Sequence, residues 1–297
     1  RATVGSLKSL PQVHRPGLPA GLAGPDNGRS GLVAWRALYF QPGVFRPDAS
    51  KSDEWNRGAY LVQGLGHCNE CHTERDSLGG LKKDQHLTGG RIPALAWYAP
   101  DLSTQSGGGL EGWRAQDIVD LLKTGQSAKG TAFGPMADVV RLSTQHMTDA
   151  DLQAVATYLQ SLPPRASPAS TAPFMRAASA EQGGTLYAKH CADCHGKDGN
   201  GVAGIYPPLN GNITVTEPTG INAVRSVLLG GFAPTTAANP RPYSMPPFAQ
   251  QLRDADVAAL VTYIRQSWST RAGAGEPGAV ARSRHTQVGC SYDQPGK

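Results

Sequence analysis

The stretch that decides the fold is Cys68-Asn-Glu-Cys71-His72, and its pattern returns in Cys191-Ala-Asp-Cys194-His195. C-x-x-C-H is the attachment signature of c-type haem. Positions i and i+3 lie side by side on a helical turn, so the two thiols of each motif reach both vinyl groups on one edge of the porphyrin. The next residue directs its imidazole at the iron as the proximal ligand. The sequence therefore predicts two covalently bound haem c groups, with His72 and His195 as iron ligands.

Two other uses of paired cysteines compete with this interpretation. Two C-x-x-C pairs contain enough thiolates for a tetrahedral zinc site. The pairs lie far apart in the chain, however, and zinc leaves the histidine after each pair without a role. A thioredoxin-like C-x-x-C would lie in an alternating strand and helix pattern, which the sequence does not show. Haem attachment is the interpretation that uses all six residues.

The surroundings of the motif repeat as well. A helical segment precedes each motif, around Gly58 in one unit and the Gly183–Gly184 pair in the other, and we expect these glycines to allow close helix contact. An amphipathic helix closes each unit, with Thr148 as the N-cap of the first. Apolar residues at i, i+3, i+4 and i+7 mark the core faces of these closing helices: Leu152, Val155, Ala156 and Leu159, and Val257, Leu260, Val261 and Ile264.

Composition agrees with short elements joined by long loops. The 297 residues include 36 Gly and 23 Pro, about a fifth of the chain, which argues against a large sheet or a helical bundle. We predict a mainly α fold of two tandem class I c-type cytochrome domains. We expect an extended N-terminal arm or connector at residues 1–50. The two cytochrome domains are expected at 51–165 and 176–270, joined by a linker at 166–175. A polar C-terminal tail is expected at 271–297.

Each iron needs a sixth ligand, and methionines in proline-flanked loops are the candidates. Met136 and Met245 each follow a haem motif and precede the closing helix of its unit. Met147 abuts the N-cap of a helix and is expected to pack in the core, and Met175 falls in the linker. We therefore assign Met136 and Met245 as distal ligands. Histidine and methionine together raise the potential and close the iron to substrates, which favours electron transfer over catalysis at the iron.

Backbone carbonyls are expected to orient the proximal histidines. The Pro207–Pro208 segment follows His195 closely, and we expect one of its carbonyls to accept the Nδ1–H of that ring. Pro100 is the corresponding candidate for the first unit. His67 and His190 each precede the first cysteine of a motif, and we expect them at the surface or on the propionate side of the haem, not as ligands.

Charge and the fifth cysteine bear on partners and location. The net charge of +5 comes from residues 1–50 and 271–297, since the middle of the chain is nearly neutral. Basic residues spread among Gly and Pro do not form a nucleic-acid surface. Because haem c is assembled outside the bacterial cytoplasm, we expect a periplasmic protein. Cys290 is either a free surface thiol or a disulfide partner of another subunit.

Several further segments resemble one family over nearly the whole chain, the multi-haem cytochrome c subunits of bacterial membrane-associated alcohol, gluconate and sugar dehydrogenases. These segments are Ala34-Trp35-Arg36, Asn56-Arg57-Gly58-Ala-Tyr60, Trp97-Tyr98-Ala-Pro100, Gly134-Pro135-Met136 and Tyr206-Pro-Pro-Leu-Asn-Gly-Asn212. Members of this family usually carry three haem units. The resemblance implies a two-haem form without the first unit, because residues 9–40 resemble the connector that follows it. That unit is either lost from the protein or trimmed from the chain.

The resemblance also implies a function. In this family a catalytic subunit of flavin, quinoprotein or molybdenum type oxidises an alcohol, sugar or aldehyde, and the cytochrome passes the electrons to ubiquinone or another acceptor. The chain would then be an electron-transfer subunit and not an enzyme by itself, in the periplasm or at the outer face of the inner membrane, with only indirect or peripheral membrane contact. Two alternatives stay open: a di-haem enzyme of peroxidase or thiosulfate dehydrogenase type, and a stand-alone or self-assembling carrier.

Overall fold

The structure is a computed structural model that describes residues 9–11, 29–92, 95–103, 109–163, 177–270, 272–275 and 277–285. The chain forms two units, Arg1–Val44 and Phe45–Lys297. The first contains helix α2 (Arg29–Tyr39), in which Trp35 packs on Tyr39 with ring centroids 5.0 Å apart. This helix differs from the extended arm that the Gly-rich and Pro-rich sequence predicts here. Several of its apolar side chains are exposed, among them Leu32, Val33 and Leu38.

The second unit begins with the first haem-motif region. Its helices are α3 (Asp53–Tyr60), α4 (Asn69–His72), α5 (Ala115–Thr124), α6 (Pro135–Leu142) and α7 (Asp149–Gln160), and a π-helical turn, Leu61–Leu65, extends α3. Two-residue and three-residue strands form the pairs β1 (Gly90–Ile92) with β2 (Trp97–Ala99) and β3 (Gln126–Ser127) with β4 (Gly130–Thr131), both antiparallel. Short 3-10 turns lie at Lys83–Gln85 and Thr144–His146.

The second haem-motif region repeats this plan. It contains α8 (Ala177–His190), α9 (Ala192–His195), α10 (Ile213–Thr216), α11 (Ile221–Leu229) and α12 (Asp254–Gln266), with β5 (Gly231–Phe232) paired to β6 (Ser244–Met245). A further helix, α13 (Pro277–His285), packs on α11 and α12 and buries Val280 completely. This helix lies in the segment predicted as a polar tail, because its surface residues are polar and Val280 is its main buried apolar side chain.

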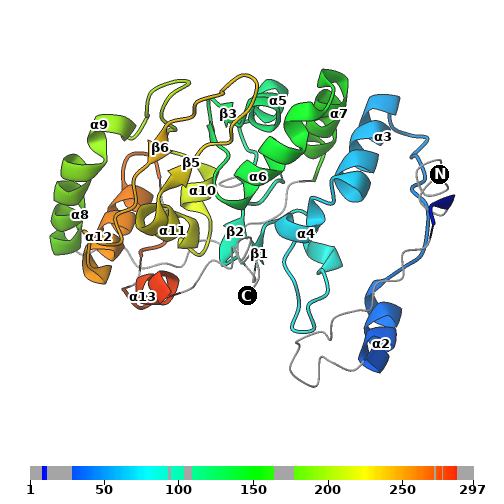
Figure 1. The fold of residues 1–297 in the computed structure, drawn as a ribbon, viewed down its shortest axis with the longest axis horizontal. Helices are drawn as coiled ribbons and strands as arrows, with labels where there is room; N and C mark the ends of the chain where they lie inside the picture. Colours follow the sequence, from blue (N-terminus) through cyan, green and yellow to red (C-terminus); the bar gives the residue numbers. More distant parts are fainter. Residues whose placement is uncertain are drawn as a thin grey trace. The chain divides into compact units, whose positions relative to one another are not determined.

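In each region the helix before the motif packs against the closing helix, α3 on α7 and α8 on α12 (Figure 1). The eight predicted core-face residues are all buried, and Thr148 accepts the Asp151 N–H as the N-cap of α7. Each pair of helices contributes side chains to its own apolar cluster. Leu152 belongs to the cluster of α3 and α7, and Leu260 belongs to the cluster of α8 and α12. The predicted closing helices and their core faces are thus confirmed. No helix in the described part of the chain has the length and apolar character needed to cross a bilayer.

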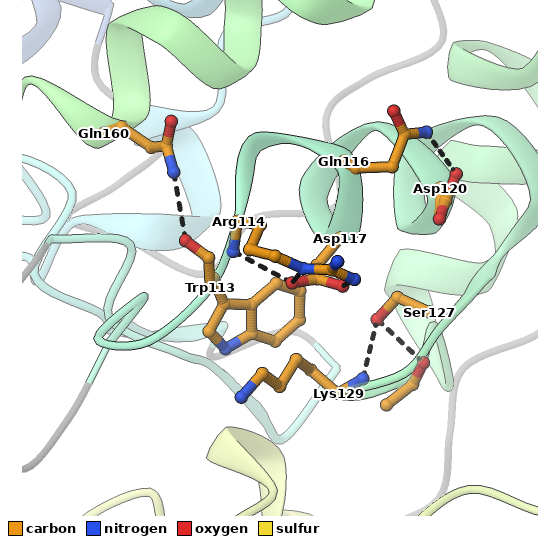
Figure 2. A network of polar contacts seen from close by, with 9 residues as sticks. Trp113, Arg114, Gln116, Asp117, Asp120, Ser127, Lys129 and Gln160 are labelled. Atoms are coloured by element: carbon orange, nitrogen blue, oxygen red, sulfur yellow. Dashed lines mark hydrogen bonds and ion pairs between the residues drawn. The ribbon is translucent and has the colours of Figure 1, made fainter. Parts of the chain in front are cut away.

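A polar network fixes the start of α5, which leads into β3 and β4. Figure 2 shows the Asp117 carboxylate accepting the backbone N–H of Arg114 at 2.9 Å and its guanidinium as well, while Gln160 of α7 donates to the Trp113 carbonyl. This is a capping-box arrangement, in which a side chain on the first turn satisfies a free N–H at the helix start. The hydrogen bonds from the Arg114 side chain and backbone hold the pKa of Asp117 below its ordinary value.

Replacing Asp117 with asparagine should therefore cost about 1 kcal/mol of unfolding free energy near pH 7. Because the pKa of Asp117 is lowered in the folded protein, its stabilisation is present above the unfolded value of 3.8 and is lost as the pH falls through the folded value. The deficit of Asp117→Asn should therefore shrink in acid. Denaturant titrations at several pH values measure this. Asp120→Asn, on the same helix, is the control, and an equal and pH-independent loss in both variants would contradict the account.

The two haem-motif regions are in direct contact. The Asn222 side chain of α11 exchanges two hydrogen bonds with the backbone of Tyr98 in β2, accepting from its N–H at 2.9 Å and donating to its carbonyl at 2.7 Å. Thr236 donates to the carbonyl of Thr124 at 3.0 Å. These contacts join the strand next to the first motif to the helix that lines the second site.

Asn222 is 1% exposed, so Asn222→Ala would leave both polar groups of Tyr98 without their side-chain partner. We expect a loss of about 1–3 kcal/mol in unfolding free energy. The exposed Asn200, whose side chain bonds to the exposed Asp198, provides the control Asn200→Ala with a change within about 0.5 kcal/mol. Thermal or denaturant unfolding followed by near-UV circular dichroism measures both, and equal stability of the two variants would refute the contact's role.

Candidate haem sites

Both haem motifs form a single helical turn. The N–H of His72 donates to the Cys68 carbonyl at 2.9 Å, and the N–H of His195 donates to the Cys191 carbonyl at the same distance. One turn of α4 or α9 therefore presents two thiols at positions i and i+3 and an imidazole directly after them, as the spacing predicts.

A backbone carbonyl orients each imidazole. The Nδ1 atom of His72 lies 2.7 Å from the Pro100 carbonyl oxygen, and that of His195 lies 3.0 Å from the Pro207 carbonyl oxygen. Since a carbonyl only accepts, each Nδ1 carries the proton and each Nε2 keeps a free lone pair, the arrangement of a metal-bound histidine. Both predicted carbonyl contacts are confirmed.

Burial makes these side chains suitable ligands. It lowers the pKa of both His72 and His195, an effect that the carbonyl hydrogen bonds partly oppose, so the neutral imidazole is favoured. Burial also raises the pKa of the Cys68 thiol to about 11 and that of the Cys191 thiol to about 12. A neutral imidazole with a free Nε2 can bind iron directly.

The thiols form neither a disulfide nor a zinc site. Cys68, Cys71, Cys191 and Cys194 are all free. Within the described ranges, no group of three or more His, Cys, Asp or Glu side chains could hold a metal ion. The four thiols therefore do not meet in a tetrahedral site, and the zinc alternative has no geometric support.

A large apolar cavity adjoins the second motif. Cys191, Cys194 and His195 line it together with Met245. Apolar side chains make up much of the remaining lining: Leu209, Val215, Val227, Phe248 and Ile264. Two thiols, an oriented imidazole and a thioether on an apolar cavity form the donor set that haem c requires.

Residues of the first region also line this second cavity. Gln126 of β3, Thr131 of β4 and Phe133 come from the hairpin and loop that follow α5. Phe133 lies three residues before Met136, the candidate ligand of the first site. Sequence reasoning missed these lining residues, because nothing in the local pattern of 126–133 indicates contact with a second domain.

The structure places the described methionines in three different settings, and Met136 lies in a helix and not in the expected loop. Met245 lies on β6, paired with Gly231, at the second cavity. Met136 lies in the first turn of α6, directly after Gly134 and Pro135. Met147 packs against the first apolar cluster, which confirms its predicted core role. Met175 and Cys290 lie outside the described residues.

The histidines that precede the motifs differ from each other. His190 lines the second cavity and packs edge-on against Phe248, with ring centroids 5.6 Å apart. His67 is exposed and has a positive φ of 36° in the turn that enters the first motif.

The fold and the two sites define a c-type cytochrome with two haem-binding regions. The profile of the family described as cytochrome c matches residues 56–163 and 180–268, each of which contains one C-x-x-C-H motif. The chain therefore belongs to the cytochrome c family, and it carries two covalently bound haem c groups.

Its curated relatives include the cytochrome components of several dehydrogenases. The chain is 38% identical, over 85% of its length, to the alcohol dehydrogenase (quinone), cytochrome c subunit, of Gluconobacter oxydans (strain 621H). It is 34% identical, over 82% of its length, to the gluconate 2-dehydrogenase cytochrome c subunit of Pantoea cypripedii. It is 33% identical, over 87% of its length, to the fructose dehydrogenase cytochrome subunit of Gluconobacter japonicus. The chain covers 55%, 59% and 58% of these relatives respectively.

Proposed function

We propose that this protein relays electrons between a dehydrogenase and a respiratory acceptor through its two haems. The observation that carries the proposal is that both regions line the second cavity. Cys191, Cys194 and His195 line it from the second region, and Phe133 lines it from the first. The second cavity therefore adjoins the first region within one unit, which supports an internal electron relay.

The proposal assigns a role to each side chain of the donor set. Cys68 and Cys71 attach the first haem, and Cys191 and Cys194 attach the second. His72 with Met136, and His195 with Met245, are the axial pairs. A bound haem of this kind exchanges single electrons, and ligation by histidine and methionine leaves no position for a substrate. The haem-binding domains correspond to residues 51–165 and 176–270.

The relatives support a dehydrogenase as the partner. Their names describe cytochrome subunits of a quinone-linked alcohol dehydrogenase, a gluconate dehydrogenase and a fructose dehydrogenase. We infer a catalytic partner that oxidises an alcohol, sugar, aldehyde or related small molecule, and a quinone or another respiratory carrier as acceptor. Covalent haem assembly favours the periplasm, at the outer face of the inner membrane. Cys290 is a candidate for a disulfide with that partner.

Purification of the tagged, fully matured protein from its native host tests the relay. We expect a dehydrogenase subunit to co-purify and to be identified by mass spectrometry. Adding substrates of the relatives' classes to the complex should reduce both haems within one turnover, and a quinone analogue should reoxidise them. Reduction of neither haem by any co-purifying subunit, or turnover of peroxide or thiosulfate by the isolated chain, would contradict the proposal.

A further inference from the structure

Arg225 of α11 is a buried cation that has no hydrogen-bond partner among the described residues. Its side chain is 0% exposed, and among the described residues Nε, Nη1 and Nη2 all lack an acceptor. Arg265, which is also deeply buried in this region, donates to the carbonyls of Val215, Gly273 and Glu217. The contrast shows that this fold can satisfy a buried guanidinium, which makes the unsatisfied one at Arg225 significant.

The surroundings of Arg225 supply little compensation for its charge. Its guanidinium carbon lies over the ring of Trp97, 5.2 Å from the centroid. A cation–π contact of this kind contributes less than the burial of an unpaired charge costs. Burial lowers the pKa of Arg225, and no described acidic group opposes that shift. A guanidinium nevertheless stays protonated in proteins, so an anion bound at this site would neutralise its buried positive charge.

The contact with Trp97 connects the guanidinium to the first region, although Arg225 belongs to the second. In sequence, Trp97 lies three residues before Pro100, whose carbonyl orients His72. A Cβ atom added at Gly134 would lie 3.0 Å from the indole of Trp97, and Gly134 leads directly into Met136. The residue that packs on Arg225 therefore contacts the segment that presents the candidate distal ligand of the first haem.

We propose that Arg225 binds a propionate of the haem held by the first region, in an ion pair that crosses between the two regions. The propionates are the carboxylates that this cofactor brings, and the planar guanidinium binds a carboxylate through two parallel hydrogen bonds. The neighbours of Arg225 on α11, Ser226 and Val227, line the cavity of the second haem, whose propionate is the competing source of the carboxylate. The inference rests on haem attachment and not on the proposed relay or its partner.

An arginine in this position would couple the first haem to the contact between the regions. Its positive charge favours the reduced, less positive iron, so removing the charge should lower the potential of the first haem. The ion pair also keeps the propionate ionised, so its loss should make that potential vary with pH near neutrality.

The matured two-haem protein is tested with Arg225→Leu, Arg225→Lys and the control Arg253→Leu. The Arg253 side chain is 84% exposed in the same region, so the control removes the same charge from the surface. Spectroelectrochemical titration measures both potentials, and the wave displaced by Met136→Ala identifies the first haem. We expect a lowered first-haem potential in Arg225→Leu, a smaller shift in Arg225→Lys, which keeps the charge, and no shift in Arg253→Leu.

Resonance Raman spectra of the unaltered protein provide the second measurement, which does not depend on a variant folding. A propionate bonded to a guanidinium should shift its bending band between H₂O and D₂O, and Arg225→Leu should abolish that sensitivity for one haem. Unchanged potentials in Arg225→Leu, or no isotope-sensitive propionate band in the unaltered protein, would overturn the proposal. Displacement of only the second-haem wave would overturn the assignment to the first haem.

Discussion

Met136→Ala and Met245→Ala should each lower the potential of one haem and leave the other nearly unchanged. Methionine as the sixth ligand raises the potential of a haem, and axial ligands set haem potentials over about 0.8 V, so we expect a shift on the order of 0.1 V or more. Loss of the thioether also opens a coordination position. The altered iron should become high-spin and bind carbon monoxide when reduced, as absorption and EPR spectra of the matured protein would reveal.

Met147→Leu is the matched control for both variants. Met147 packs against the first apolar cluster, so a side chain of similar volume should change the unfolding free energy by less than about 1.5 kcal/mol. Neither potential should move. A displaced potential in Met147→Leu, or unchanged spectra in Met136→Ala, would show that the first haem takes a different sixth ligand.

The second large effect concerns the glycines at the two helix crossings. A Cβ atom at Gly58 would overlap the carbonyl of Ala154 on α7 and lie 2.8 Å from Tyr158 Cβ. At Gly183 it would overlap the carbonyl of Ala259 on α12 and lie 2.6 Å from Tyr263 Cβ. Backbone cannot move aside as a flexible side chain can. Gly58→Ala and Gly183→Ala should therefore each cost about 3 kcal/mol or more, the upper end of the range for overpacking.

Gly64→Ala provides the control, because its added Cβ would meet only the Tyr60 ring at 4.0 Å, an ordinary contact distance. Denaturant unfolding followed at the haem absorbance of each region should show that Gly58→Ala weakens the first site and Gly183→Ala the second. Stabilities equal to that of Gly64→Ala would mean that the helix pairs do not pack as closely as described.

The predictable part of this structure is the part that repeats. Two haem motifs, the glycines at the helix crossings and the core faces of α7 and α12 depend on spacings within one segment, so sequence periodicity reveals them. The contacts of the Pro100 and Pro207 carbonyls with the proximal histidines could also be predicted, since each proline lies on a loop that must return to its histidine.

The contact between the two regions could not be predicted in the same way. Asn222, Arg225 and Phe133 look like ordinary helix and loop residues, and their roles depend on which surfaces of the two regions meet. The burial of Arg225 is the clearest case, because a charged residue in the middle of a helix usually indicates a solvated face. Helix α13 could not be predicted for a related reason, because its position against α11 and α12 depends on tertiary packing.

The central claim is that two haems, each closed by histidine and methionine, act together as an electron relay. The most direct test is a spectroelectrochemical titration of the matured protein, with carbon monoxide added to the fully reduced form. The account predicts two one-electron waves, the absorption spectrum of low-spin haem for both irons, and no carbon monoxide binding at either iron. A single haem wave, or carbon monoxide binding at either iron of the unaltered protein, would contradict it.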